Sequence, residues 1–173
     1  LITSASSYLS DAFIDANFEM FSRVMSGKTK QEPRWKRALN VPNHILGEAV
    51  GELYVEKYFP ASSKEKMLKL VNNLKVALGE HIASLEWMSD KTKVNALIKL
   101  NSFTVKIGYP DKWRDYSGIT VDPTKSYWEN VRAARAFESA HALSKYGKPV
   151  DRDEWGMTPQ TVNAYYNPTT NEI

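Results

Sequence analysis

The chain has 173 residues, of which 42% are hydrophobic and 25% charged, a composition typical of globular proteins with a core of their own. It has no cysteine, which excludes disulfide bonds, thiolate metal ligands and cysteine nucleophiles. The formal net charge of +3 is small for this length.

Neither end of the sequence resembles a natural terminus. Residues 1–7 carry no positive charge and no long apolar run, so we do not expect them to form a signal peptide. No stretch approaches the roughly 18 uninterrupted apolar residues of a membrane span. Leu1 is not an initiator methionine, and Glu172 and Ile173 look like the start of a returning strand. We therefore expect a segment of a longer polypeptide.

Apolar residues recur at helical spacing along most of the chain, which predicts a mainly α fold with several helices. The first predicted helix, residues 8–25, is apolar over so much of its circumference that we expect burial on two sides. Gly27 is its natural stop. Further helical regions are expected to begin at Pro33, Ser62, Ser89 and Ser126.

Several of the expected helix ends carry their own signals. Ser62 with Glu65 three residues later has the pattern of a capping box, and Ser89 and Ser126 are candidate N-caps. Gly147 and Pro149 are expected to end the last helix.

The helical region that begins at Pro33 is expected to end at Pro60. Three residues within it bear on its shape. Pro42 either kinks or restarts it, and the sequence leaves both possibilities open. Gly47 and Gly51, four residues apart, predict a close crossing with another helix.

The C-terminal residues change to the pattern of a strand. Val162, Ala164 and Tyr166 alternate with Asn163 and Tyr165, and a turn-forming sequence follows at 167–171. These features predict a small β-hairpin at the C-terminus, after a linker at 149–153 and a helical turn at 158–159. A further short strand is expected at 103–107.

Side chains suited to catalysis are sparse. There is no His-Glu-x-x-His, no Gly-x-Ser-x-Gly and no phosphate-binding glycine loop. His44 and Glu48 are expected at positions i and i+4 of one helix, close enough to share a metal, but no third ligand is fixed and such pairs are common on solvated faces. His81 and His141 are better explained as boundary and packing residues. We expect no catalytic residue, metal ligand or cofactor in this chain.

The basic stretch from Lys28 to Arg37 raises the question of nucleic-acid binding. Basic residues at a helix start usually form a solvated face, so we expect no nucleic-acid partner.

The strand around Asn163 is the remaining candidate for function. The Asn163 amide carries both donors and an acceptor and could bind the main chain of an extended peptide, and a free strand edge could accept another strand. In the plainer interpretation Asn163 bonds only local backbone, and Tyr165 and Tyr166 pack into a core. Periodicity alone favours this plainer interpretation.

Six short segments, spread over essentially the whole chain, form a more specific pattern. They are Pro33–Arg37; Gly51–Val55 with Phe59; Trp87–Met88 followed by Thr92–Lys93; Lys106–Pro110; Asp153–Trp155; and Val162–Tyr166 with Asn171–Ile173. In this order they resemble the neprilysin-like zinc endopeptidases, and most of all the bacterial members called oligopeptidase O. Ala38 stands where animal members have a cysteine, which agrees with a bacterial protein.

The resemblance implies a two-lobed, mainly helical enzyme located outside the cytoplasm, in the periplasm or secreted. It implies that residues 1–148 belong to a helical lobe and that 149–173 begin the catalytic lobe. The zinc ligands of the family would lie beyond Ile173, so zinc is expected in the full-length parent and the chain alone is expected to be inactive.

The resemblance also implies a substrate-binding role for three residues. In the family, an asparagine side chain and an alanine carbonyl hold the substrate backbone along an edge strand, and these positions match Asn163 and Ala164. Tyr165 would lie beside the cleft. The implied partners are a peptide substrate and the remainder of the catalytic lobe. The alternative function is a stand-alone helical interaction module whose edge strand pairs with a protein partner.

Overall fold

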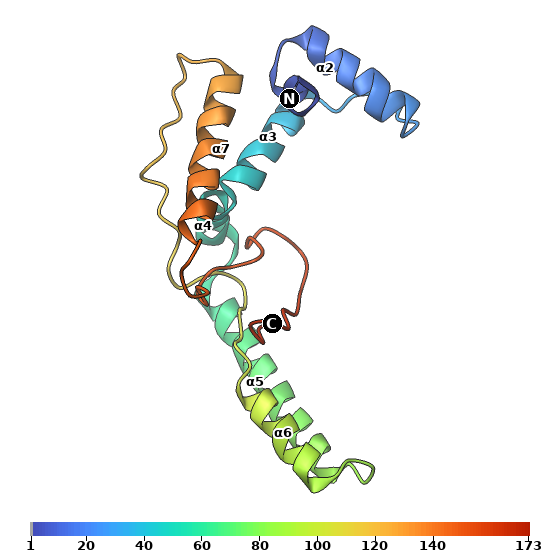
Figure 1. Ribbon diagram of the computed structural model, residues 1–173, viewed down its shortest axis with the longest axis vertical. Coiled ribbons are helices and arrows are strands. Elements are labelled where there is room, and N and C mark those ends of the chain that lie inside the picture. Colours follow the sequence, from blue (N-terminus) through green and yellow to red (C-terminus); the bar gives the residue numbers. More distant parts are fainter. Residues whose placement is uncertain (1) are drawn as a thin grey trace. The chain divides into compact units, whose positions relative to one another are not determined.

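A computed structural model describes residues 2–173 of the chain, and this part is mainly helical (Figure 1). The helical elements are α1 (Ile2–Ala5), the 3-10 turn η1 (Ser6–Tyr8), α2 (Asp11–Asn17), the π-helical η2 (Phe18–Val24), α3 (Arg34–Ile45), α4 (Gly47–Tyr58), α5 (Ala61–Ser84), α6 (Asp90–Asn101) and α7 (Tyr127–Ser144). The predicted mainly helical fold is confirmed.

The chain forms two compact units that are interleaved in sequence. Unit 1 comprises Leu1–Val50 and Arg114–Val150, and unit 2 comprises Gly51–Trp113 and Asp151–Ile173. The division into a lobe at 1–148 and the start of another at 149–173 concerns a larger protein and stays a prediction.

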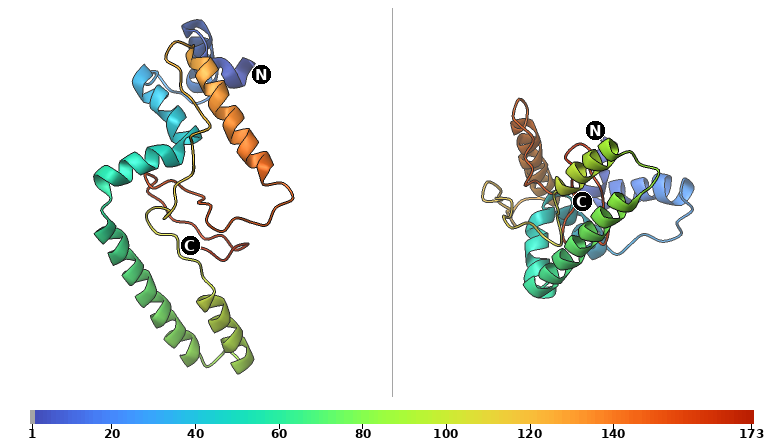
Figure 2. Two further views of the ribbon diagram at one scale, coloured as in Figure 1. Left: turned by 90° about the vertical axis from the view of Figure 1, so that its left-hand side faces the viewer. Right: turned by 90° about the horizontal axis from the view of Figure 1, so that it is seen from below.

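In unit 1, α3 and η1 both contact α7 (Figure 2). The ring of Tyr8 stacks on Trp128 with 6.2 Å between centroids, and its hydroxyl accepts a hydrogen bond of 2.8 Å from Arg135. Val131 and Ala134 of α7 are buried. Ser126 caps α7 as predicted, and Glu129 completes a capping box with it.

The first predicted helix is present as the continuous pair α2 and η2, and Gly27 ends it at a φ of +67°. The expectation that it is buried on two sides is wrong for this structure. Phe13, Met20 and Val24 are 45%, 53% and 68% exposed, because no other element within residues 2–173 covers this face.

The region around Pro42 is settled by the structure. Helix α3 continues through Pro42 as far as Ile45, and the break falls at Leu46, whose φ and ψ are −116° and 38°. Helix α4 begins directly afterwards at Gly47.

In unit 2, α5 and α6 lie side by side as an antiparallel pair (Figures 1 and 2). Gly79 of α5 faces Leu97 and Leu100 of α6, and both Leu100 and Ile82 are buried. Ser89 caps α6 as predicted. The capping box predicted at Ser62 is wrong, because Pro60 takes the N-cap position of α5 and Ser62 already lies inside the helix.

The predicted β-hairpin at the C-terminus is not confirmed, since no strand is assigned within residues 2–173. The turn at 168–171 does form and is closed by one antiparallel bridge between Asn167 and Glu172. Residues 161–166 have no neighbouring strand among the described residues, so the alternating pattern there does not produce a ladder.

The strand predicted at 103–107 is likewise reduced to a single parallel bridge between Thr104 and Glu172. Backbone hydrogen bonds nevertheless run from Thr104 N–H to Asn171 O, from Lys106 N–H to Ile173 O and from Ile173 N–H to Thr104 O. Residues 104–106 therefore pair with residues 171–173, where the returning strand was expected to start. At 158–160 a single turn forms in place of the expected helical turn.

None of the helices in the part of the chain that the structure describes combines the length and the apolar character needed to cross a membrane.

Candidate functional site

Asn163 and Ala164 lie on an exposed segment of unit 2. Both residues are exposed, and the side chain of Val162 just before them is fully open to solvent. The Oδ1 atom of Asn163 accepts a hydrogen bond of 2.8 Å from the Ala164 N–H, and the Asn163 N–H donates to the carbonyl of Thr161 at 3.1 Å. The segment is therefore a locally hydrogen-bonded loop that is exposed to solvent.

The start of this loop is anchored to α4. Pro159 lies so close to Gly51 that a Cβ atom on the glycine would stand 2.8 Å from Cδ of the proline. The sequence correctly indicates a close approach at Gly51, but a loop and not a helix makes it. The Thr161 N–H donates to Thr158 O at 3.0 Å, which closes the turn that leads into the exposed segment.

Tyr165 anchors the other end. Its side chain is half-buried, and its ring lies against Gly156, where a Cβ atom would stand 3.3 Å from the ring. Its hydroxyl donates to Oε1 of Glu172 at 3.3 Å and accepts from the Gly156 N–H at 3.4 Å. Tyr165 thus faces into unit 2.

Glu172 and Lys106 form a buried ion pair behind Tyr165. Lys106 Nζ lies 2.9 Å from Glu172 Oε2, and the two side chains are only 6% and 7% exposed. Lys106 also donates to the carbonyl of Glu154 at 2.6 Å. Burial acts to raise the pKa of the Glu172 carboxyl, but the hydrogen bonds and charge of Lys106 and the hydroxyl of Tyr165 outweigh it, so the pKa is lowered. Glu172 is therefore charged at neutral pH.

This ion pair has no counterpart among the roles assigned from the sequence. Lys106 and Glu172 are 66 residues apart, and each appears there only as part of a family-like segment. The available signal was weak: a lysine between Val105 and Ile107 in a short apolar segment, a setting in which a charged side chain needs a partner.

The residues that could bind a metal do not converge. Within residues 2–173 no three histidine, aspartate or glutamate side chains form a group that could hold a metal ion. His44 and Glu48 lie on either side of the break at Leu46, so they are not on one helix as expected. Nδ1 of His44 is hydrogen-bonded to Asn40 O, and the Glu48 carboxylate accepts the Arg114 N–H. Because catalytic zinc needs three protein ligands, the residues present do not fit such a site.

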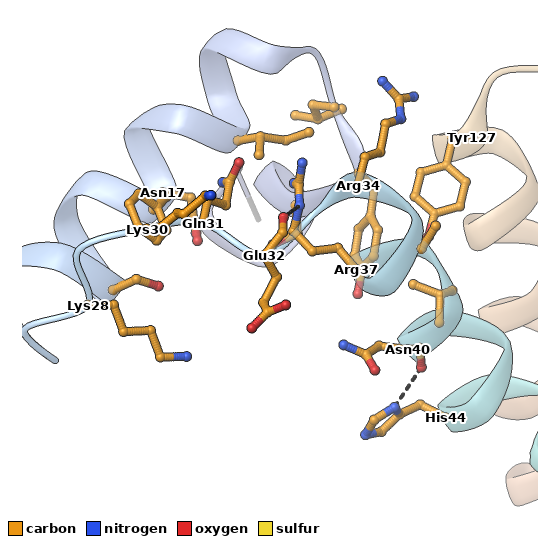
Figure 3. A pocket seen from close by; sticks show the side chains of 18 of the residues that line it. Asn17, Lys28, Lys30, Gln31, Glu32, Arg34, Arg37, Asn40, His44 and Tyr127 are labelled. Atoms are coloured by element: carbon orange, nitrogen blue, oxygen red, sulfur yellow. Dashed lines mark hydrogen bonds between the residues drawn. The ribbon is translucent and has the colours of Figure 1, made fainter.

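A hollow of about 1050 Å³ in unit 1 is lined by polar and apolar side chains together with several basic ones (Figure 3). The lining includes Lys28, Lys30, Arg34, Arg37 and Arg135, with Glu32 as the single acidic residue. Several of these cations have partners close in sequence or space: Arg37 Nε donates to Glu32 O, and Arg34 lies 3.9 Å from Asp11. Arg34 is 78% exposed, which fits the expected solvated helix start.

Comparison with known proteins decides the family. The family model Peptidase_M13_N, described as peptidase family M13, matches residues 1–110. The chain belongs to peptidase family M13. The predicted resemblance to the neprilysin-like zinc endopeptidases is confirmed.

Three relatives show how far the M13 likeness extends. Neprilysin-11 of Caenorhabditis elegans is 31% identical, over 96% of this chain and 20% of its own length. The open-state cryo-EM structure of the Mycobacterium tuberculosis zinc metalloprotease Zmp1 is 44% identical with a TM-score of 0.89, over 99% of this chain and 26% of that one. PepO from Lactobacillus rhamnosis is 26% identical with a TM-score of 0.87, over 98% of this chain and 27% of that one.

This chain therefore spans between 20% and 27% of the length of these three proteins. The likeness to PepO agrees in part with the expected resemblance to oligopeptidase O, although the mycobacterial protein is more similar in sequence. The long structural match to Zmp1 and PepO covers both compact units.

Proposed function

We propose that this chain is part of a zinc-dependent metalloendopeptidase, in which it supplies lobe helices and the peptide-binding segment Asn163–Tyr165. The proposal places the zinc site in residues outside this chain and the enzyme outside the cytoplasm. Membership of family M13 supports it, as does the small share of each relative that the chain covers. The alternative, a stand-alone interaction module, is not favoured because the M13 likeness extends over the whole chain.

The observation that carries the proposal is an exposed backbone segment held firmly at both ends. Pro159 against Gly51 holds one end, and Tyr165 with its hydrogen bonds to Gly156 and Glu172 holds the other. A loop fixed in this way loses little conformational entropy when a ligand binds, which improves both affinity and alignment.

The chemistry of the segment suits an extended peptide. Because Asn163 accepts the Ala164 N–H through Oδ1, its Nδ2 hydrogens are available to donate to a peptide carbonyl. Ala164 is an exposed residue, and its carbonyl can accept a peptide N–H. A donor on Asn163 and an acceptor on Ala164, the next residue, can bind a peptide main chain whatever its side chains are. They would hold the peptide in register for cleavage.

The decisive experiment is Asn163→Ala in the complete enzyme that carries this chain. We expect kcat/KM for a short internally quenched peptide to fall about 10- to 100-fold, because alignment of the peptide is lost, with the thermal unfolding midpoint unchanged. Asn73→Ala, on the exposed surface of α5, is the matched control and should leave the kinetics unaltered. Kinetics unchanged in Asn163→Ala would refute the assignment.

The absence of catalytic machinery from these residues can be tested separately. The purified 173-residue chain should retain no stoichiometric zinc after dialysis and should not hydrolyse the same peptide. The encoding reading frame should continue into a His-Glu-x-x-His segment. Peptide hydrolysis by the chain alone with bound zinc, or a stop codon after Ile173, would contradict this part of the proposal.

A further inference from the structure

The peptide plane between Ala164 and Tyr165 connects the proposed peptide-binding surface to the interior of unit 2. The carbonyl of Ala164 and the N–H of Tyr165 belong to one planar group, so the position of Tyr165 sets the direction of the Ala164 carbonyl. The side chain of Tyr165 is half-buried, and its ring is confined by Gly156. Whatever holds the Tyr165 side chain therefore also orients an acceptor proposed to bind the peptide.

The Tyr165 hydroxyl is held by the buried ion pair. Glu172 accepts from Lys106 through Oε2 at 2.9 Å and from Tyr165 through Oε1 at 3.3 Å, so both carboxylate oxygens are engaged. Lys106 in turn donates to the carbonyl of Glu154, two residues before Gly156. The carboxylate therefore connects Tyr165 to Lys106, and Lys106 connects both to the stretch around Glu154.

A buried ion pair is a poor device for stability, because the desolvation of both charges offsets much of their attraction, but it imposes a defined geometry. Here the backbone that carries Glu172 has a defined geometry as well. The backbone on both sides of Glu172 is also held, because Thr104 is hydrogen-bonded to Asn171 and Ile173, and Lys106 to Ile173.

We propose that Glu172 and Lys106 are positioning residues for peptide binding: through the Tyr165 hydroxyl they fix the exposed segment that carries Asn163 and Ala164. This inference rests on the proposed function of that segment. It assigns no contact with the peptide to Glu172 or Lys106, which are both buried.

The test uses Tyr165→Phe in the complete protein, because this change removes only the hydroxyl and leaves both the ring and the ion pair in place. Tyr166→Phe is the matched control, since the Tyr166 hydroxyl bonds Asn171 on the turn and not Glu172. Binding of a fluorescein-labelled peptide with blocked ends to the zinc-free protein should weaken about fivefold in Tyr165→Phe, because the hydrogen bonds of the hydroxyl to Glu172 and Gly156 are both lost, and stay unchanged in Tyr166→Phe.

Two further measurements separate positioning from general stability. Amide hydrogen exchange at residues 161–166 should accelerate in Tyr165→Phe while exchange in α5 and α6 stays the same. Glu172→Gln should weaken peptide binding at least as much. Its effect should be less than additive with that of Asn163→Ala, because both changes act through one segment.

The outcomes distinguish the positioning role of Glu172 and Lys106 from the proposed function of the exposed segment. If Asn163→Ala weakens binding but Tyr165→Phe does not, the positioning role is wrong and the proposed function stands. If Asn163→Ala has no effect, the proposed function fails and this inference fails with it. Strict additivity of Glu172→Gln and Asn163→Ala would also overturn the positioning role.

Discussion

Gly51 and Pro159 are packed so closely that a methyl group on the glycine would stand 2.8 Å from Cδ of the proline ring. The same methyl group would lie 3.0 Å from Oε1 of Gln160. Gly51 lies inside α4, where glycine lowers the stability of the helix. The lack of a side chain at this position leaves room for the loop that carries Pro159. The turn that opens the exposed segment before Asn163 depends on this contact.

Gly51→Ala is therefore expected to destabilise the protein despite the better helix propensity of alanine. The gain of up to about 1 kcal/mol in an open helix position is outweighed by overpacking against a rigid ring, which costs about 1–3 kcal/mol. Native-state hydrogen exchange of the α4 amides measures the net loss, and peptide binding should weaken with it.

Gly79→Ala in α5 is the matched control. A Cβ atom there would meet the Leu100 side chain at 3.6 Å, an ordinary van der Waals contact. The same substitution should raise the local stability of α5 by about 0.5–1 kcal/mol. Equal effects of the two substitutions would contradict the close packing of Gly51.

Gly108 and Gly27 provide a second pair, in which both residues have a positive φ, of +78° and +67°. A Cβ atom on Gly27 would meet nothing, so Gly27→Ala should cost only the roughly 1 kcal/mol of a left-handed alanine. A Cβ atom on Gly108 would stand 2.8 Å from the ring of Phe59, so Gly108→Ala should cost about 2–4 kcal/mol. Hydrogen-exchange rates of the amides around Gly27 in unit 1 and around Gly108 in unit 2 measure the two losses of stability.

Arg114 in unit 1 leads to a prediction about charge-conserving replacement. Its guanidinium lies over the rings of Tyr116 and Phe137, at 5.2 and 5.3 Å from their centroids, and donates to Glu138 at 2.9 Å. Lysine keeps the charge but loses the planar stacking, so Arg114→Lys should destabilise unit 1 by about 1–2 kcal/mol. Arg132→Lys on the exposed side of α7 should change stability by less than about 0.5 kcal/mol, and thermal unfolding of the two variants tests the difference.

Local sequence signals predicted the helices well because capping and periodicity act within a few residues. Ser89 and Ser126 cap α6 and α7 as expected. Ser62 did not, because Pro60 provides an equally good helix start two residues earlier and the local pattern cannot choose between them. The exposed face of α2 shows the opposite limit: periodicity identifies an apolar face but not what covers it.

The candidate site was predictable only in part. The sequence and the family resemblance led to Asn163 and Ala164, which the structure shows to be exposed, although their binding role stays a prediction. The Lys106–Glu172 pair was not predicted, because it depends on contact between segments 66 residues apart. The expected hairpin failed for a related reason, since an alternating pattern forms strands only where a neighbouring strand is available.

Glu172 should make the stability of the protein depend on pH in the acid range. Its folded-state pKa lies below the ordinary value of 4.5, so its pairing with Lys106 contributes stability that is fully present above pH 4.5. That contribution is lost as the pH falls through the lowered pKa, where the carboxylate takes up a proton. Other carboxylates with lowered pKa values, among them Glu129 of the capping box, titrate in the same range, so only a difference between variants isolates Glu172.

The comparison is between wild type and Glu172→Gln, which cannot ionise. The difference in unfolding free energy should be constant above pH 4.5 and should shrink steadily below it. Glu129→Gln serves as the reference for an exposed, hydrogen-bonded carboxylate, and unlike Glu172→Gln it should leave peptide binding unchanged at neutral pH. A wild-type and Glu172→Gln difference that stays constant down to strongly acid pH would show that Glu172 is not held charged by Lys106 in the folded protein.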